Sequence, residues 1–140
     1  MNIGIDIHGT ADRYPNLFMD LVDTWRASGH VIHIITGESG DTARKQISDL
    51  NIPYDKFFSI TDWASGQNCP IERTPSGPWM SPDVWNSAKG IYCRKHDIGL
   101  HFDDTVEYAA SMPKGCTFIL VGEDFDQAWS AIEDAVEGEK

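Results

Sequence analysis

Hydrophobic and polar residues follow two spacings along this chain, one typical of strands and one typical of helices. Short β-branched or aromatic runs predict five strands, at residues 2–7, 30–36, 56–60, 98–102 and 117–121. Apolar residues at helical spacing predict helices at residues 14–28, 41–50, 85–96, 106–111 and 126–137. Strands that alternate with helices are typical of a parallel sheet covered on both faces. We therefore expect one α/β domain over residues 1–140, with a three-layer, Rossmann-like open parallel sheet of five strands.

One segment interrupts this alternation. Residues 61–82 are rich in proline and glycine, so we expect an irregular loop insertion there. Long loops without regular structure are usually functional or disordered. The segment contains Trp63 and Trp79, which could fold over a ligand or pack on the body of the domain. Packing is the more common fate of aromatic side chains.

Charge and composition narrow the class of protein. The chain has 22 acidic and 11 basic residues and a net charge of −11, which argues against a general nucleic-acid binder. Its apolar runs fall short of the roughly 18 residues that a membrane span needs, and its N-terminus lacks a secretory pattern. The three cysteines are odd in number and widely spaced, as expected for free thiols in a reducing compartment. We therefore expect a cytoplasmic protein without membrane contacts.

Acidic and small polar residues follow the ends of the predicted strands. Asp6 comes at the end of the first strand, Thr36-Gly37 at the end of the second, and Asp103-Asp104 at the end of the fourth. The carboxyl ends of parallel strands lie on one edge of the sheet, where α/β folds place their ligands. Carboxylates crowded there repel one another unless a cation is present, and Mg²⁺ prefers such oxygen ligands. The sequence therefore predicts a magnesium site at this edge.

Other residues near the same edge suit a phosphate. Thr36 offers a hydroxyl group, Gly37 offers an accessible backbone N–H, and Lys89 offers a positive charge. These are the groups that stabilise the oxygens of a phosphoryl group during transfer.

Taken in order, these residues resemble the four motifs of the haloacid dehalogenase-like (HAD) hydrolase superfamily. The segment Asp6-Ile7-His8-Gly9-Thr10 is similar to the first motif, Asp-x-Asp-Gly-Thr, and residues 33–37 are similar to the second, a hydrophobic strand that ends in Ser or Thr. Lys89 stands where the third motif has a lysine, and residues 100–104 end in the paired acids of the fourth. The resemblance covers nearly the whole chain. Segments 11–29 and 61–88 are too small for a full cap domain, so the chain resembles an uncapped member.

The resemblance implies a role for each residue of the site. Asp6 would attack phosphorus and form an aspartyl-phosphate. The Asp6 carboxylate, the backbone carbonyl of His8 and one of Asp103 or Asp104 would hold Mg²⁺.

The phosphoryl group would be bound by Thr36, Gly37 and Lys89. Lys95 is an alternative to Lys89 because it lies closer to the fourth strand. It falls late in its helix, however, where a basic residue complements the helix dipole.

His8 departs from the family pattern. The family has a second aspartate at this position, which protonates the leaving group and then activates water. A histidine side chain can do both near neutral pH. Phosphorylation of Asp6 could therefore survive the change while turnover becomes slow, shifted in pH or absent. His30, His33 and His101 are interpreted as structural residues.

Two functions remain open after this comparison. The first is a Mg²⁺-dependent phosphohydrolase that acts on a phosphate monoester, either a phosphorylated small molecule or the phosphate end of a larger substrate. The second is a catalytically impaired HAD-fold protein that binds metal and phosphate. A phospho-acceptor signalling domain is disfavoured, because its paired acids would end the first strand and here they end the fourth.

Overall fold

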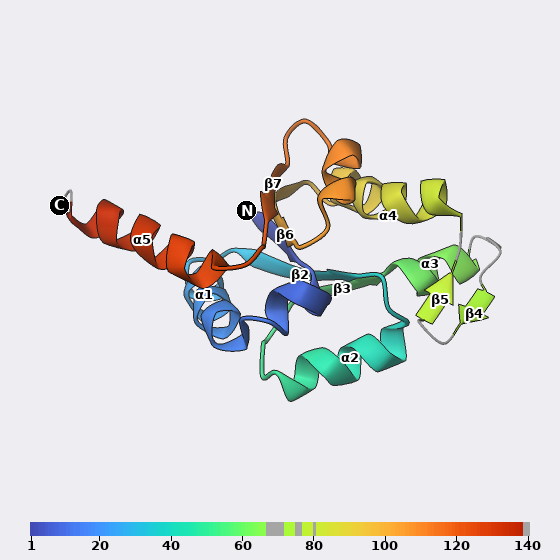
Figure 1. Ribbon diagram of the computed structural model, residues 1–140, viewed down its shortest axis with the longest axis horizontal. Helices are drawn as coiled ribbons and strands as arrows, with labels where there is room; N and C mark the ends of the chain where they lie inside the picture. The colour runs from blue at the N-terminus through green and yellow to red at the C-terminus, as the bar shows by residue number, and fades with distance from the viewer. Residues whose placement is uncertain (67–71, 75–76, 80, 139–140) are drawn as a thin grey trace.

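A five-stranded, all-parallel sheet forms the centre of the protein (Figure 1). The computed structural model describes residues 1–66, 72–74, 77–79 and 81–138. The strands of the sheet are β1 (Asn2–Ile5), β2 (Val31–Thr36), β3 (Lys56–Ser59), β6 (Ile98–Asp103) and β7 (Thr117–Leu120). Their order is β3-β2-β1-β6-β7, so β1 lies between β2 and β6. The predicted fold class is therefore confirmed.

Helices cover both faces of this sheet. They are α1 (Pro15–Ala27), α2 (Gly40–Asp49), α3 (Ile60–Gly66), α4 (Pro82–Lys95) and α5 (Phe125–Gly138), with a π-helical turn η1 (Ile7–Ala11) and a 3-10 helix η2 (Val106–Ser111). Figure 1 shows α1 and α2 on one side of the sheet, and α4 and η2 on the other. This is the three-layer, Rossmann-like arrangement that the sequence predicts.

The larger core lies between the sheet and the α1 and α2 side. Alternate strand residues point into it, as strand periodicity requires. Its buried members include Ile3, Ile5, Ile32, Ile34, Phe102, Phe18, Val22, Ala43, Ile47 and Phe125. The α4 side has a smaller apolar cluster of Ile35, Tyr92, Cys93 and Ile98. Polar strand residues therefore face α4, and this places the candidate site on that side.

Residues 61–82 differ from the irregular loop that their composition predicts. Most of α3 lies in this segment, and β4 (Glu72–Thr74) pairs antiparallel with β5 (Gly77–Trp79). The seven-residue helix is too short to show a clear helical period, but Ile60 and Ala64, one turn apart, pack against Ala88 of α4. Trp63 packs on the same cluster, as the packing interpretation expects. Cys69 and the side chain of Trp79 lie outside the described residues.

Two further observations on the described residues concern membrane-spanning helices and free cysteines. None of the described helices has the length and apolar character that crossing a bilayer requires. Cys93 is buried, Cys116 is partly buried, and both are free cysteines.

Candidate active site

The carboxylates of Asp6 and Asp103 share one buried lysine. Asp6 directly follows β1, and Asp103 is the last residue of the neighbouring strand β6. The Nζ atom of Lys89, on α4, lies 3.0 Å from Oδ1 of Asp6 and 2.7 Å from Oδ2 of Asp103. All three residues are at most 5% exposed. The structure thus brings three of the expected site residues into direct contact.

Strand periodicity explains how these side chains meet. Every second residue of a strand points to the same face, so Gly4 shares a face with Asp6, and His101 shares a face with Asp103. Gly4 and His101 lie opposite each other in the parallel pairing of β1 and β6. A Cβ atom on Gly4 would lie 2.7 Å from Nδ1 of His101. The glycine therefore leaves room for a buried histidine beside the site.

Asp103 is held by three donors. Its Oδ2 atom accepts hydrogen bonds from Lys89 and from Nε2 of His101, at 2.7 and 2.9 Å, and its Oδ1 atom accepts one from the backbone N–H of Thr105, at 3.1 Å. Burial alone would raise the pKa of Asp103, but the Lys89 charge and the His101 hydrogen bond hold that pKa below its ordinary value. Asp103 is therefore a fixed carboxylate.

Asp6 is in a different electrostatic state. Burial raises the pKa of Asp6 to about 7; Lys89 opposes this shift, while the charges of Asp103 and Asp104 add to it. Burial would lower the pKa of Lys89, but the carboxylates of Asp6 and Asp103 raise it. The lysine thus stays charged, whereas burial leaves Asp6 only partly ionised at neutral pH despite its contact with Lys89. A further cation beside Asp6 would favour its carboxylate form.

Three carboxylates converge in a way that suits a metal ion. One oxygen each from Asp6, Asp103 and Asp104 lies within 4.8 Å of the others, and Asp104 is exposed. The side chain of Asp104 lies so close to Gly9 that a Cβ atom at that position would overlap it, and Gly9 has a φ of 76°. Glycine is therefore required in this turn for both conformation and space. The oxygen donors fit Mg²⁺, which takes carboxylate, carbonyl and water ligands.

His8 lies on the turn η1 rather than inside the carboxylate cluster. Its side chain is 49% exposed, and its Nδ1 atom lies 3.7 Å from Oδ2 of Asp12. The other oxygen of Asp12 accepts a 2.7 Å hydrogen bond from the backbone N–H of Gly9, which ties down the turn. The imidazole therefore stands at the solvent side of the site.

The loop after β2 is fixed by its neighbours. Thr36 is fully buried, and its hydroxyl accepts a 3.2 Å hydrogen bond from the backbone N–H of Glu38. The carbonyl of Gly37 accepts a 2.7 Å hydrogen bond from the hydroxyl of Thr61 on α3. The indole of Trp85 covers Gly37 so closely that a side chain there would overlap it. The segment predicted to bind phosphate is thus rigidly placed.

Sequence reasoning missed three neighbours of the site. His101 was interpreted as structural, but it donates to Asp103. The ring centroid of Tyr108 lies 4.6 Å from Nζ of Lys89, and the indole of Trp85 lies against Gly37. For His101 a signal existed, since it stands two residues before Asp103 on a strand. Tyr108 and Trp85 reach the site only through the packing of η2 on α4.

The alternative lysine lies elsewhere. Lys95 is exposed and borders a hollow lined also by Phe58, Trp63 and Tyr92. Lys89, rather than Lys95, makes the contact with both carboxylates.

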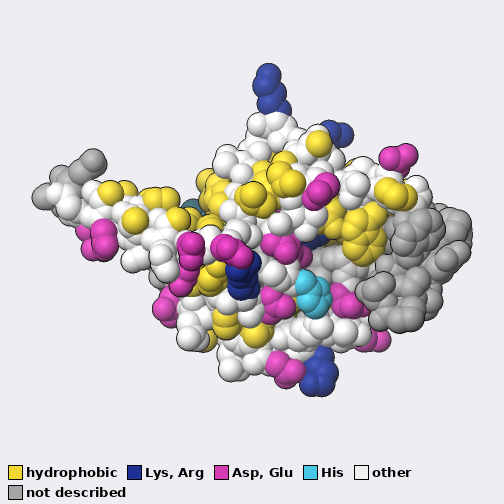
Figure 2. Space-filling view, in the orientation of Figure 1, with side chains coloured by type: hydrophobic (Ala, Val, Ile, Leu, Met, Phe, Trp, Pro, Cys, Tyr) yellow, Lys and Arg dark blue, Asp and Glu magenta, His cyan; other side chains and the backbone are white. Residues whose placement is uncertain are grey.

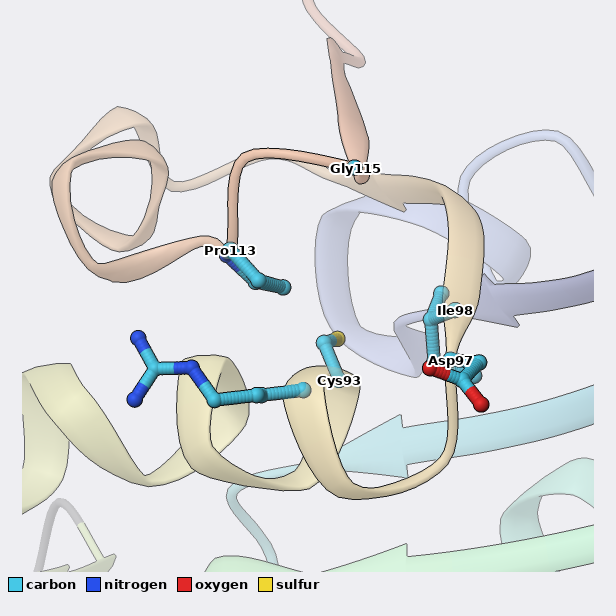
Figure 3. Close-up of a pocket in the computed structure, with 6 residues that line it drawn as sticks. Cys93, Asp97, Ile98, Pro113 and Gly115 are labelled. Atoms are coloured by element: carbon cyan, nitrogen blue, oxygen red, sulfur yellow. The ribbon is translucent and has the colours of Figure 1, made fainter.

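Another cavity lies at the opposite end of β6 from Asp103. It has a volume of about 190 Å³ and is bordered by Cys93, Ile98, Pro113 and Gly115. Figure 3 shows Cys93 on α4 directed toward the loop that carries Pro113 and Gly115. Because Ile98 begins β6 and Asp103 ends it, this cavity is separate from the carboxylates.

Comparison with known proteins identifies a similar fold but gives no information on the chemistry of the site. The crystal structure of an uncharacterized protein from Corynebacterium glutamicum ATCC 13032 has a similar fold, with a TM-score of 0.58 and 14% sequence identity. The similarity covers 94% of this chain and 90% of that one. No family model and no curated protein matches this chain. At so low an identity, the likeness bears on the fold alone.

Proposed function

We propose that the protein is a HAD-like, Mg²⁺-dependent phosphohydrolase that acts on a phosphate monoester through an aspartyl-phosphate on Asp6. The observation that carries this proposal is the sharing of Lys89 by Asp6 and Asp103 at the carboxyl edge of the sheet. A nucleophilic carboxylate that approaches an anionic phosphate needs a fixed cation beside it, and Lys89 supplies one.

The proposed attack uses the less engaged oxygen of Asp6. Oδ1 accepts a 3.0 Å hydrogen bond from Lys89, whereas Oδ2 has only a long, 3.4 Å contact with the hydroxyl of Thr10. Oδ2 forms the bond to phosphorus, the bond from phosphorus to the leaving oxygen breaks, and that oxygen takes a proton from His8. Water then attacks the phosphorus of the aspartyl-phosphate, with His8 accepting its proton; the bond from phosphorus to Oδ2 of Asp6 breaks, and inorganic phosphate and the free Asp6 carboxylate are released.

Magnesium fits the donors around this nucleophile. The Asp6 and Asp104 carboxylates and the backbone carbonyl of His8 would hold it. Asp103 contributes less, because three donors already occupy its oxygens. When bound, Mg²⁺ would offset the negative charge of the phosphoryl oxygens. The raised pKa of Asp6 supports this assignment, since Lys89 is the one cation that contacts Asp6 among the described residues.

The proposed substrate is a phosphorylated small molecule or the phosphate end of a larger one. The two segments that could form a cap are small: residues 11–29 carry α1, and residues 61–88 carry parts of α3 and α4 with the β4–β5 hairpin. A site without a full cap leaves space for a large substrate. The net charge of −11 disfavours nucleic acid. The cytoplasmic location expected from sequence stays a prediction.

The test is release of phosphate from an aryl phosphate such as p-nitrophenyl phosphate. We expect release that requires Mg²⁺ and is lost in Asp6→Asn. Asp49→Asn is the matched control, because Asp49 lies on α2 with an exposed side chain paired to Lys45. Release that persists in Asp6→Asn, or that EDTA leaves unchanged, would contradict the proposal.

A catalytically impaired phosphate- and metal-binding protein is the alternative, and His8 favours it. The imidazole is half exposed and lies beside Asp12 rather than among the carboxylates. In this case the wild type releases no phosphate, yet calorimetry shows Mg²⁺ binding that Asp6→Asn abolishes. Turnover that appears only in His8→Asp would establish the alternative.

A further inference from the structure

Among the described residues, helix α5 packs on the rest of the protein through its first turns. Phe125 is 8% exposed, and its ring packs against Phe18 and Phe102. Trp129, one turn later, also packs on Phe102. Every residue from Ala131 to Gly138 is exposed. Figure 1 shows the second half of α5 extending away from the sheet.

The apolar stripe that anchors α5 continues along its exposed half. Ile132 and Val136 follow Phe125 by seven and eleven residues, so they lie on the same helix face as Phe125 and Trp129. Their side chains are 58% and 57% exposed. The exposed residues Ala128, Ala131 and Ala135 border them. Figure 2 shows hydrophobic side chains in a row along this helix.

A continuous stripe of this kind differs from scattered exposed apolar residues. Single exposed apolar side chains are ordinary on protein surfaces, whereas a contiguous apolar patch marks an interaction site. A helix in water also draws most of its stability from packing of its apolar face. Within the described part of the chain, that face is covered only near Phe125 and Trp129. The outer half therefore suits an apolar partner.

The charges on α5 indicate what kind of partner its exposed half would bind. Helix α5 carries four acidic residues and no lysine or arginine. At 100° per residue, Asp126, Glu133 and Glu137 lie along one flank of the apolar stripe. A second copy of the chain, itself at −11, would be repelled as it approached this acidic flank. A helix with basic flanks would be attracted.

We propose that the exposed half of α5 binds a basic amphipathic helix of a partner protein. The apolar face of the partner covers Ile132 and Val136, and its lysine or arginine side chains lie beside Glu133 and Glu137. This is recognition of one amphipathic helix by the apolar face of another, with electrostatic selection of the partner. The proposal does not depend on the chemistry proposed for Asp6.

The test uses the 140-residue chain and a fluorescent peptide of leucine and lysine, ordered to form an amphipathic helix. A control peptide has the same composition in an order that breaks the helical pattern. The double variant Ile132→Gln/Val136→Gln removes the apolar face without changing the charge, and circular dichroism checks that α5 remains helical. A second variant, Glu133→Gln/Glu137→Gln, keeps the apolar face and removes two charges.

We expect the amphipathic peptide to bind the wild type and to bind the Ile132→Gln/Val136→Gln variant at least about tenfold more weakly. Binding to the Glu133→Gln/Glu137→Gln variant should be weaker and less sensitive to salt. Equal affinity of the two peptides, or equal affinity for the wild type and the apolar-face variant, would overturn the proposal, since attraction would then be purely electrostatic. Sedimentation equilibrium that shows a dimer lost in the apolar-face variant would also overturn it, because the occupant would be a second copy.

Discussion

At the scale of single residues, Asp6 and Asp103 differ in how burial affects their carboxylates. The buried carboxylate of Asp6 is disfavoured, whereas that of Asp103 is stabilised by its neighbours. The pKa of Asp6 in the folded state, about 7, lies above its ordinary value, because burial disfavours the carboxylate. The folded state therefore holds this proton more tightly than the unfolded state does. The stabilising effect is complete in acid and is lost as the pH rises from about 4 toward 7.

Asp6→Asn should therefore stabilise the protein at alkaline pH in the absence of metal. Urea unfolding in EDTA should show a gain of about 1–3 kcal/mol at pH 8, since the neutral amide avoids burying a charge while Lys89 keeps its contact with Asp103. At pH 5 the difference should nearly vanish, because Asp6 is then protonated. A loss of stability at pH 8 would mean that the Asp6 carboxylate stabilises the fold through Lys89.

Asp103→Asn is the matched control and should change stability in the opposite direction. The pKa of Asp103 is held below its ordinary value, so its stabilising effect is present above that value and is lost as the pH falls. Its three donors would lose a charged acceptor. We expect a loss of about 2–4 kcal/mol at pH 8, by the same urea unfolding measurement.

His8 is the residue at which the chain leaves the pattern it resembles. If its imidazole carries the proton, His8→Ala should slow phosphate release roughly 10²–10⁴-fold, the usual contribution of a general acid–base group. His8→Asp should raise the rate or move its optimum toward acid. Initial rates over a pH series measure both. If the wild type is active and the His8→Ala variant is equally fast, then His8 contributes only its backbone carbonyl to the site.

Sequence reasoning found the acidic residues of the site because they stand at strand ends. Asp6 and Asp103 meet as expected, since parallel neighbouring strands bring their ends together. It could not find Trp85 and Tyr108, because their places depend on how α4 and η2 pack. That Asp103 rather than Asp104 is enclosed by donors also follows from side-chain packing, which the adjacent pair of acids does not reveal.

At the scale of elements, the packing of α4 on η2 sets the position of Lys89. Gly90, the next residue, lies against Ser111, and a Cβ atom there would overlap the backbone carbonyl of Ser111. Gly90→Ala would gain up to about 1 kcal/mol in helix propensity but would push α4 from η2. We expect net destabilisation in urea and weaker phosphate release, because Lys89 moves with its helix.

Gly66→Ala is the control for this prediction. Gly66 ends α3, and a Cβ atom there would meet no atom of the described residues within 4 Å. The variant should be as stable as the wild type or more so. If the Gly90→Ala variant were more stable than the wild type, η2 could move away from α4 without destabilising the protein.

The elements themselves were predictable wherever their patterns were long. The strands and the helices of ten or more residues begin and end within a few residues of the predicted bounds. The exception is the segment 61–82, where α3 and two three-residue strands are too short for a periodic signal. Proline and glycine correctly mark an interruption there, but they do not reveal the short elements within it.

At the scale of the whole molecule, buried groups respond to acid in opposite ways. Acidification favours the folded state through Asp6, whose pKa is raised. It disfavours the folded state through His33 and His101, because burial lowers the pKa of both imidazoles. Each histidine ties the sheet together: His101 binds Asp103, and His33 lies between β1 and α4. Between pH 4 and 7 these three groups therefore act against one another: Asp6 opposes the two histidines.

His33 makes the most direct test of that balance. In the neutral imidazole with its hydrogen on Nε2, the ring donates to Oδ1 of Asn2 at 3.0 Å and accepts from the Tyr92 hydroxyl at 2.7 Å. Burial, with repulsion from His96 and Lys56, lowers the pKa of His33 to about 4. The unfolded chain takes up this proton below about pH 6.5, so the contribution of His33 to stability should fall from pH 6.5 toward pH 4, opposite to that of Asp6.

His33→Gln should flatten this acid loss, because glutamine does not titrate. Urea unfolding at several pH values would show it as a smaller slope of unfolding free energy against pH, after a cost of about 1–2 kcal/mol at pH 8 for the altered hydrogen bonds. Tyr92→Phe removes one partner but keeps the imidazole, so it should lower stability while the acid slope remains. If His33→Gln kept the full slope, the acid response would have to come from His101 beneath the candidate active site rather than from the sheet's centre.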